Sequence, residues 1–233
     1  MSNTESGHYD REFETAREVI RPLVEFKPTN KKARAFDFDD TLIGRQRVTR
    51  IGGAVIGKAK PHHLPDLTAE QIAALQLNHN IRSGGIHSPI EAISYFFHSI
   101  RSVYPGVKQE LETLAEGTDI FGNTGRSNKD PWVQMTRQTL RRGEVYDLFR
   151  GVFYTPEKTR TAVSKAHVVS ILSELYEEVE FDDDDPRTAR FIAERYPNIK
   201  VNLVQYGSTG LLMSSRELDQ VPNLRRVAIL GSK

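Results

Sequence analysis

Short apolar runs alternate with amphipathic stretches along most of this chain. The apolar runs predict strands at residues 33–38, 118–122, 151–155, 179–181, 200–205 and 227–230. Apolar residues at helical spacing predict helices at residues 10–26, 107–115, 132–142, 165–176 and 189–196. Strands that alternate with helices need crossover connections, so the pattern predicts an α/β fold with a mainly parallel sheet.

Residues 44–103 interrupt this alternation directly after the first strand. A pair of glycines predicts the turn of a hairpin within residues 47–58. Two helices are expected next, at residues 68–77 and at residues 88–100, the second with Ser88 as its cap. We therefore expect a small, mostly helical cap with a flap hairpin, inserted after the first strand.

The remaining residues, 1–43 and 104–233, are expected to form one core. Residues 1–30 read as an N-terminal helical extension of this core. At 233 residues the chain is long enough to bury a full hydrophobic core. Its 38% hydrophobic and 27% charged residues are typical of a soluble globular protein.

Charge and cysteine content exclude several classes of function. A formal net charge of +1 gives no whole-molecule field that would attract nucleic acid or a membrane. The absence of cysteine excludes disulfides, thiolate zinc sites and cysteine nucleophiles. Residues 1–10 are polar and no apolar run approaches membrane-spanning length, so we expect a cytoplasmic protein without membrane contact.

Polar residues gather where the predicted strands end. Asp37 and Asp39 come at the end of the first strand, Thr124 follows the second, and the acidic run Asp182–Asp185 follows the fourth. The carboxyl ends of parallel strands lie at one edge of a sheet, so these residues are expected to meet there. The charges of Asp37 and Asp39 repel by roughly 1 kcal/mol in water and about 4 kcal/mol near a protein surface. A fold normally avoids this repulsion unless a cation or a reaction uses both carboxylates.

Together these residues resemble the four motifs of the haloacid dehalogenase (HAD) superfamily, over roughly residues 33–206. In the order of the family, the motifs are Asp37-x-Asp39-x-Thr41, Thr124 after an apolar strand, Lys165 at a helix start and Asp183-Asp184 after a strand. The resemblance implies a Rossmann-like three-layer sandwich. It also implies a Mg²⁺-dependent phosphatase that hydrolyses a phosphate monoester through an aspartyl-phosphate. Relatives that cleave carbon–halogen bonds lack the second aspartate, so Asp39 favours phosphoryl transfer.

The resemblance implies a role for each motif residue. Asp37 would attack the phosphorus, and Asp39 would give a proton to the leaving oxygen and later take one from water. Thr124 would hydrogen-bond a phosphoryl oxygen, and Lys165 would neutralise the nucleophile and the phosphate. Lys158 is the rival to Lys165, but it lies in a predicted loop without the helix context.

A Mg²⁺ ion is implied between these carboxylates and the phosphate, because hard cations prefer oxygen ligands. The resemblance implies ligands from Asp37, from the main-chain carbonyl of Asp39 and from an acid of the fourth motif. The run Asp182–Asp185 offers four candidates for that acid. The expected strand end favours Asp184 as the metal-directed acid, with Asp183 as its neighbour. At least one of the four is expected to face water.

Three features bear on the substrate. Thr41 is expected to brace the loop after the first strand, and Gly125 and Arg126 are expected near the substrate. Five basic residues and no acid lie between residues 43 and 65. They either attract a multiply charged anion, such as a nucleotide or a nucleic-acid end, or form a solvated hairpin. Trp132 either stacks a base or packs in the core, and core packing is the commoner case.

The same motifs also serve two alternative functions. A phosphomutase of the superfamily would return the phosphoryl group to a sugar instead of giving it to water. A non-catalytic module would bind metal or phosphate on this fold without turnover. Every catalytic residue type of the motifs is present, which favours an enzyme over a binding module.

Overall fold

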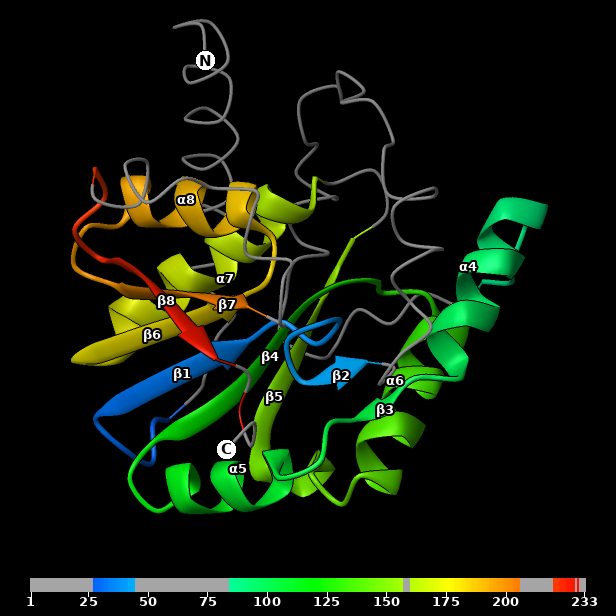
Figure 1. Ribbon diagram of the computed structural model, residues 1–233, viewed down its shortest axis with the longest axis horizontal. Helices are drawn as coiled ribbons and strands as arrows, with labels where there is room; N and C mark the ends of the chain where they lie inside the picture. Colours follow the sequence, from blue (N-terminus) through cyan, green and yellow to red (C-terminus); the bar gives the residue numbers. More distant parts are fainter. Residues whose placement is uncertain (1–26, 45–83, 157–159, 206–219, 229, 231–233) are drawn as a thin grey trace, which may run out of the picture.

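Six parallel strands form the central sheet of the protein, in the order β5-β4-β1-β6-β7-β8 (Figure 1). The computed structural model describes residues 27–44, 84–156, 160–205, 220–228 and 230. The strands of this sheet are β1 (Lys32–Phe36), β4 (Asp119–Ser127), β5 (Phe149–Thr155), β6 (Glu178–Asp183), β7 (Lys200–Gln205) and β8 (Leu224–Ala228). The predicted α/β fold with a mainly parallel sheet is confirmed.

Helices cover the sheet on both faces and complete three layers (Figure 1). One face carries α5 (Val107–Ala115), α6 (Asp130–Arg142) and the short 3₁₀ helix η1 (Tyr146–Leu148), and the other carries α7 (Thr161–Leu175) and α8 (Pro186–Arg195). Alternate residues of β1 point into two cores, with Ala33 and Ala35 toward α7 and Phe36 toward α5. None of the described helices is both long and apolar enough to cross a membrane.

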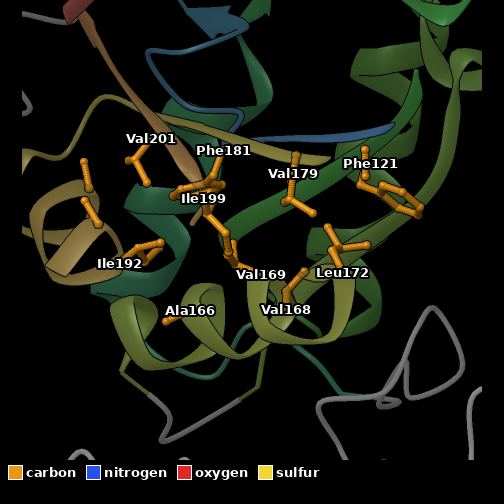
Figure 2. Packing of buried hydrophobic residues seen from close by; sticks show 14 of the residues in the cluster. Phe121, Ala166, Val168, Val169, Leu172, Val179, Phe181, Ile192, Ile199 and Val201 are labelled. Atoms are coloured by element: carbon orange, nitrogen blue, oxygen red, sulfur yellow. The ribbon is translucent and has the colours of Figure 1, made fainter. Parts of the chain in front are cut away.

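The larger core lies between the sheet and the pair α7 and α8. Figure 2 shows Val169 of α7 close to Phe181 of β6, and Leu172 of α7 close to Phe121 of β4, with Ile192 of α8 in the same cluster. Each of these side chains is at most 1% exposed. Complete burial of one such side chain stabilises the fold by roughly 1.5–3 kcal/mol. This packing fixes α7 against β4 and β6, and so determines the positions of the polar side chains of α7.

The chain changes direction across the sheet at β1. From β1 it proceeds to β4 and β5 on one side, and then returns to β6, β7 and β8 on the other. As a result β1 pairs with both β4 and β6. In open parallel sheets ligands bind beyond the carboxyl ends of the strands at such a point.

A second, two-stranded sheet joins the two ends of the predicted cap. β2 (Ile43–Gly44) pairs antiparallel with β3 (Ser102–Val103). A Cβ atom on Gly44 would lie 1.9 Å from Tyr104 Oη, so only glycine allows this close approach. The division into a core and a cap of residues 44–103 stays a prediction, and its two limits fall within these strands.

Of the predicted cap, the structure describes the last helix, α4 (Pro89–Ser99). Ser88 caps it as predicted, because its Oγ accepts a hydrogen bond from the Glu91 amide at 3.0 Å. The other predicted parts of the cap, the hairpin at 47–58 and the helix at 68–77, lie outside the described residues, and so does the predicted N-terminal helix at 10–26.

Several predicted boundaries are wrong. β4 continues to Ser127, so Thr124 lies within this strand rather than after it. α7 begins at Thr161, so Lys165 lies in its second turn rather than at its start. The helix begins earlier because Val163, which is 2% exposed, already belongs to its buried face. β8 spans Leu224–Ala228 rather than residues 227–230, because its register with β7 pairs Leu224 with Val201.

His167 on α7 is a buried histidine. It is 2% exposed, and neither of its ring nitrogens meets a hydrogen-bond partner within the described part of the chain. Burial lowers the pKa of His167 from its ordinary value of 6.5 to about 4. The folded protein therefore keeps this ring neutral at pH values where the unfolded chain protonates it.

Replacing His167 with leucine should flatten the dependence of stability on pH between about 6.5 and about 4. In this window the unfolded wild-type chain binds a proton that the folded protein does not bind. The free energy of unfolding therefore falls as the pH falls, by at most about 3 kcal/mol from this residue. Urea unfolding of wild type and His167→Leu at several pH values measures the difference. If the free energy of unfolding falls equally with pH in the two proteins, the prediction is wrong.

Candidate active site

Asp37 directly follows β1 at the carboxyl edge of the sheet, and its side chain is buried. Its amide donates to the Asp182 carbonyl oxygen at 2.8 Å, which continues the pairing of β1 with β6 by one residue. The chain then turns around Phe38, whose carbonyl oxygen accepts the amides of Thr41 at 3.3 Å and Leu42 at 3.0 Å. The Thr41 hydroxyl is buried and has no partner among the described residues, so Thr41 joins the turn through its backbone.

Lys165 joins Asp37 to Asp183 across this edge. Its Nζ lies 2.9 Å from Asp37 Oδ1 and 2.8 Å from Asp183 Oδ2, and all three side chains are buried. Burial alone would lower the pKa of Lys165, but the charges of Asp183 and Asp37 raise it above its ordinary value. Burial, with the charge of Asp37 beside it, raises the pKa of Asp183. One ammonium group thus serves two carboxylates.

Strand geometry sorts the four acids of the run Asp182–Asp185. Asp182 and Asp183 point to opposite faces of β6, so Asp182 pairs with Arg34 and Asp183 turns toward the site. Asp185 is exposed, and its carboxylate caps the amino end of α8. It is therefore an acid of the run that faces water. Asp184 lies between Asp183 and Asp185 in the sequence, and one of its carboxylate oxygens lies near those of Asp37 and Asp183.

Three of these residues, Asp37, Asp183 and Asp184, form what we call the acidic cluster. Each offers one carboxylate oxygen, and these oxygens all lie within 4.8 Å of one another. Burial, followed by the charges of Asp37 and Asp183, raises the pKa of Asp184 well above its ordinary value. Crowded carboxylate oxygens of this kind fit a hard divalent cation such as Mg²⁺.

Asp39 is not part of the acidic cluster, because cations surround its carboxylate. Arg126 donates to it from Nε at 2.9 Å and from Nη2 at 2.7 Å, and Arg101 donates from Nη1 at 3.0 Å. His98 Nε2 lies 3.5 Å away. Burial alone would raise the pKa of Asp39, but the charge of Arg126, with His98 and Arg101, holds it well below its usual range. The prediction that Asp39 contacts the metal therefore concerns its main-chain carbonyl oxygen and not its carboxylate.

β4 carries Thr124, Gly125 and Arg126 to the same edge. The Thr124 hydroxyl oxygen accepts the Arg126 amide at 3.2 Å. A Cβ atom on Gly125 would lie 2.9 Å from Thr161 Cγ2, so the glycine lets the start of α7 approach β4. The Arg126 side chain is 3% exposed and turns to Asp39. Its predicted contact with the substrate stays a prediction.

Sequence reasoning missed two residues that contact Asp39, namely His98 and Arg101. Both come from the end of the predicted cap, in the last turn of α4 and just after it. Trp132 of α6 holds this helix, with its ring centroid 5.3 Å from that of His98 and its Nε1 donating to Glu91 at 3.3 Å. Trp132 is 7% exposed, so it packs the helix against the core instead of presenting a face to a base. No local pattern marks His98 or Arg101, because only the fold brings them to Asp39.

Comparisons with known proteins agree with this architecture. No protein-family model matches the sequence, and no curated protein matches it significantly. A haloacid dehalogenase-like family hydrolase from Streptococcus pneumoniae is 15% identical, with a TM-score of 0.50 over 85% of this chain and 95% of that chain. A HAD-superfamily hydrolase from Geobacter sulfurreducens is 13% identical, with a TM-score of 0.41 over 83% and 93%. Protein Tyrosine Kinase A from Mycobacterium tuberculosis is 18% identical, with a TM-score of 0.46 over 81% and 91%. The chain has the fold of the haloacid dehalogenase-like proteins, as its motifs imply.

Replacing Lys165 with methionine should lower the free energy of unfolding by about 3–5 kcal/mol, because buried carboxylates lose their shared cation. Asp37 and Asp183 are the carboxylates left unpaired. Lys108→Met is the matched control, since it removes an exposed ion pair with Glu144 and should change stability little. Urea unfolding near neutral pH, without divalent cations, measures both variants. A loss in Lys165→Met no larger than that in the control contradicts the prediction.

Proposed function

We propose that the protein is a Mg²⁺-dependent phosphatase that hydrolyses a phosphate monoester through an aspartyl-phosphate on Asp37. One observation carries the proposal: Asp37, at the carboxyl end of β1, contacts the ammonium group of Lys165 and belongs to the acidic cluster. A carboxylate nucleophile can attack a phosphate only where positive charge offsets their mutual repulsion. The hydrolase from Streptococcus pneumoniae, which shares the fold, agrees with this proposal.

The first step forms the covalent intermediate. A carboxylate oxygen of Asp37 bonds to phosphorus while the bond from phosphorus to the leaving oxygen breaks. The leaving oxygen takes a proton from the Asp39 carboxyl group and departs as an alcohol. Lys165 and the Thr124 hydroxyl bind the phosphoryl oxygens during this transfer.

The second step releases the phosphate. The Asp39 carboxylate takes a proton from a water molecule, whose oxygen bonds to phosphorus as the bond to Asp37 breaks. The products are inorganic phosphate and a free Asp37 carboxylate, and Asp39 regains its proton. A Mg²⁺ ion held by Asp37, Asp183 and Asp184 would supply the charge that lets a phosphate approach these carboxylates.

Arg126 and Arg101 give the first step an additional requirement. They hold the Asp39 carboxylate in its ionised form, whereas proton donation needs the protonated form. A phosphate dianion also attracts guanidinium groups and forms paired hydrogen bonds with them. The substrate must therefore compete for these two arginines before Asp39 takes up its proton.

For the substrate we propose a small phosphorylated molecule, such as a nucleotide, or a phosphorylated nucleic-acid end. The leaving group departs next to Asp39, where Arg101 and Arg126 place positive charge. This charge favours a leaving group that carries further phosphates, as a nucleic-acid strand does. The basic residues between residues 45 and 60 lie outside the described residues, and their part in binding stays a prediction. A cytoplasmic location likewise stays a prediction from the sequence.

Asp37→Asn should abolish Mg²⁺-dependent release of inorganic phosphate from a panel of phosphate monoesters that begins with an aryl phosphate. Asp39→Asn should lower kcat by about 10²–10⁴-fold, the usual contribution of a general acid–base group. Asp185→Asn is the matched control, because asparagine also caps helices and the change leaves the acidic cluster intact. The control should keep wild-type activity. A wild-type protein that hydrolyses no member of the panel contradicts the proposal.

Product analysis separates the hydrolase from the phosphomutase. With a hexose phosphate as substrate, the hydrolase should release one inorganic phosphate for each substrate molecule consumed, because water accepts the phosphoryl group. A mutase would yield the isomeric hexose phosphate without matching phosphate release. Phosphorus NMR of the reaction mixture distinguishes the two products, and accumulation of the isomer would exclude the hydrolase.

A further inference from the structure

Asp182 is buried on the face of β6 opposite Asp183, and it contacts both neighbouring strands. Its carbonyl oxygen accepts the Asp37 amide at 2.8 Å. Its carboxylate accepts two hydrogen bonds from Arg34 of β1, each of 2.7 Å, and a third from Asn202 of β7 at 3.1 Å. Asp182 is 1% exposed and Asn202 is 0% exposed. Asp182 therefore ties three strands together inside the protein.

Arg34 and Asp182 form a rigid ion pair. Two parallel N–H···O bonds fix the guanidinium plane relative to the carboxylate, which a single ammonium group cannot do. The guanidinium also lies 5.0 Å from the centre of the Phe36 ring, which limits its movement. Arg225 of β8 holds Asn202 in turn, from Nε to Oδ1 at 2.6 Å. The polar network thus extends from β1 to β8.

This network lies one residue before the acidic cluster on β6 and three residues before it on β1. Asp37 follows β1, and Asp183 follows Asp182 in β6. Three carboxylates in the cluster face one ammonium group, that of Lys165, so like charges push the ends of β1 and β6 apart. These two strands lie side by side in the sheet (Figure 1). A buried pair between them resists that separation.

We propose that Arg34 and Asp182 are positioning residues of the metal site. They hold β1 against β6, and so keep the oxygens of Asp37 and Asp183 at a separation that one divalent cation can span. The inference rests on the metal dependence of the proposed function. Both residues act through the backbone of the two ligands, in the way that outer contacts commonly tune metal affinity.

The test is a titration of the full chain with Mn²⁺, as a spectroscopic substitute for Mg²⁺, followed by electron paramagnetic resonance without substrate. Arg34→Met should raise the Kd for Mn²⁺ about 10-fold or more. Arg34→Lys should raise it less, because it keeps the charge and loses only the two-pronged contact. Lys32→Met is the matched control. Lys32 pairs with Glu178 across the same two strands at 2.8 Å, but the pair is exposed, so the Kd should not change.

The outcomes separate the two proposals. A wild-type protein that binds no Mn²⁺ contradicts the metal-dependent function, and the positioning role with it. A wild-type protein that binds Mn²⁺, beside a folded Arg34→Met variant with the same Kd, overturns the positioning role alone. Circular dichroism checks that each variant folds. If Arg34→Met does not fold, Arg34→Lys decides: a raised Kd supports the role of Arg34, and an unchanged Kd overturns it.

Discussion

The site depends on one contact, the buried ammonium group of Lys165 shared by the carboxylates of Asp37 and Asp183. Each partner comes from a different element: the lysine from α7, and the two acids from the ends of β1 and β6. A buried charge is tolerated only while its partners stay in place. These three elements therefore cannot shift relative to one another without leaving a charge unpaired. The apolar packing of α7 on the sheet and the ion pairs of Lys165 therefore both fix the position of α7 relative to the strands.

Two aspartates that are two residues apart occupy opposite electrostatic surroundings. Asp37 belongs to a cluster of three carboxylates that contacts one ammonium group, whereas Asp39 lies among two arginines and a histidine. The turn around Phe38 produces this separation, because it carries Asp39 away from the strand direction of Asp37. Carboxyl groups whose surroundings differ in this way are suited to different chemical tasks.

The order of apolar and polar residues was sufficient to predict the strands, the helices and the residues near the strand ends. Alternating apolar runs predicted the parallel sheet, and the strand ends located Asp37, Thr124 and the fourth-motif acids. The period of a strand also explains why Asp182 and Asp183 have different partners. The partners of Asp39 and Asp182 could not be predicted. Arg101 is 62 residues from Asp39 and Arg34 is 148 residues from Asp182, so only the assembled sheet brings them together.

The pairing of β2 with β3 has a consequence for how such a chain can vary. Gly44 and Ser102 lie opposite each other in this small sheet, so the two ends of the intervening segment are held together. The entropy cost of closing a loop grows only with the logarithm of its length, so each doubling costs about 0.6 kcal/mol. Residues can therefore be gained or lost between these two points at little cost to the sheet. The two short strands therefore act as a junction at which the segment between them can differ in length while the main sheet stays the same.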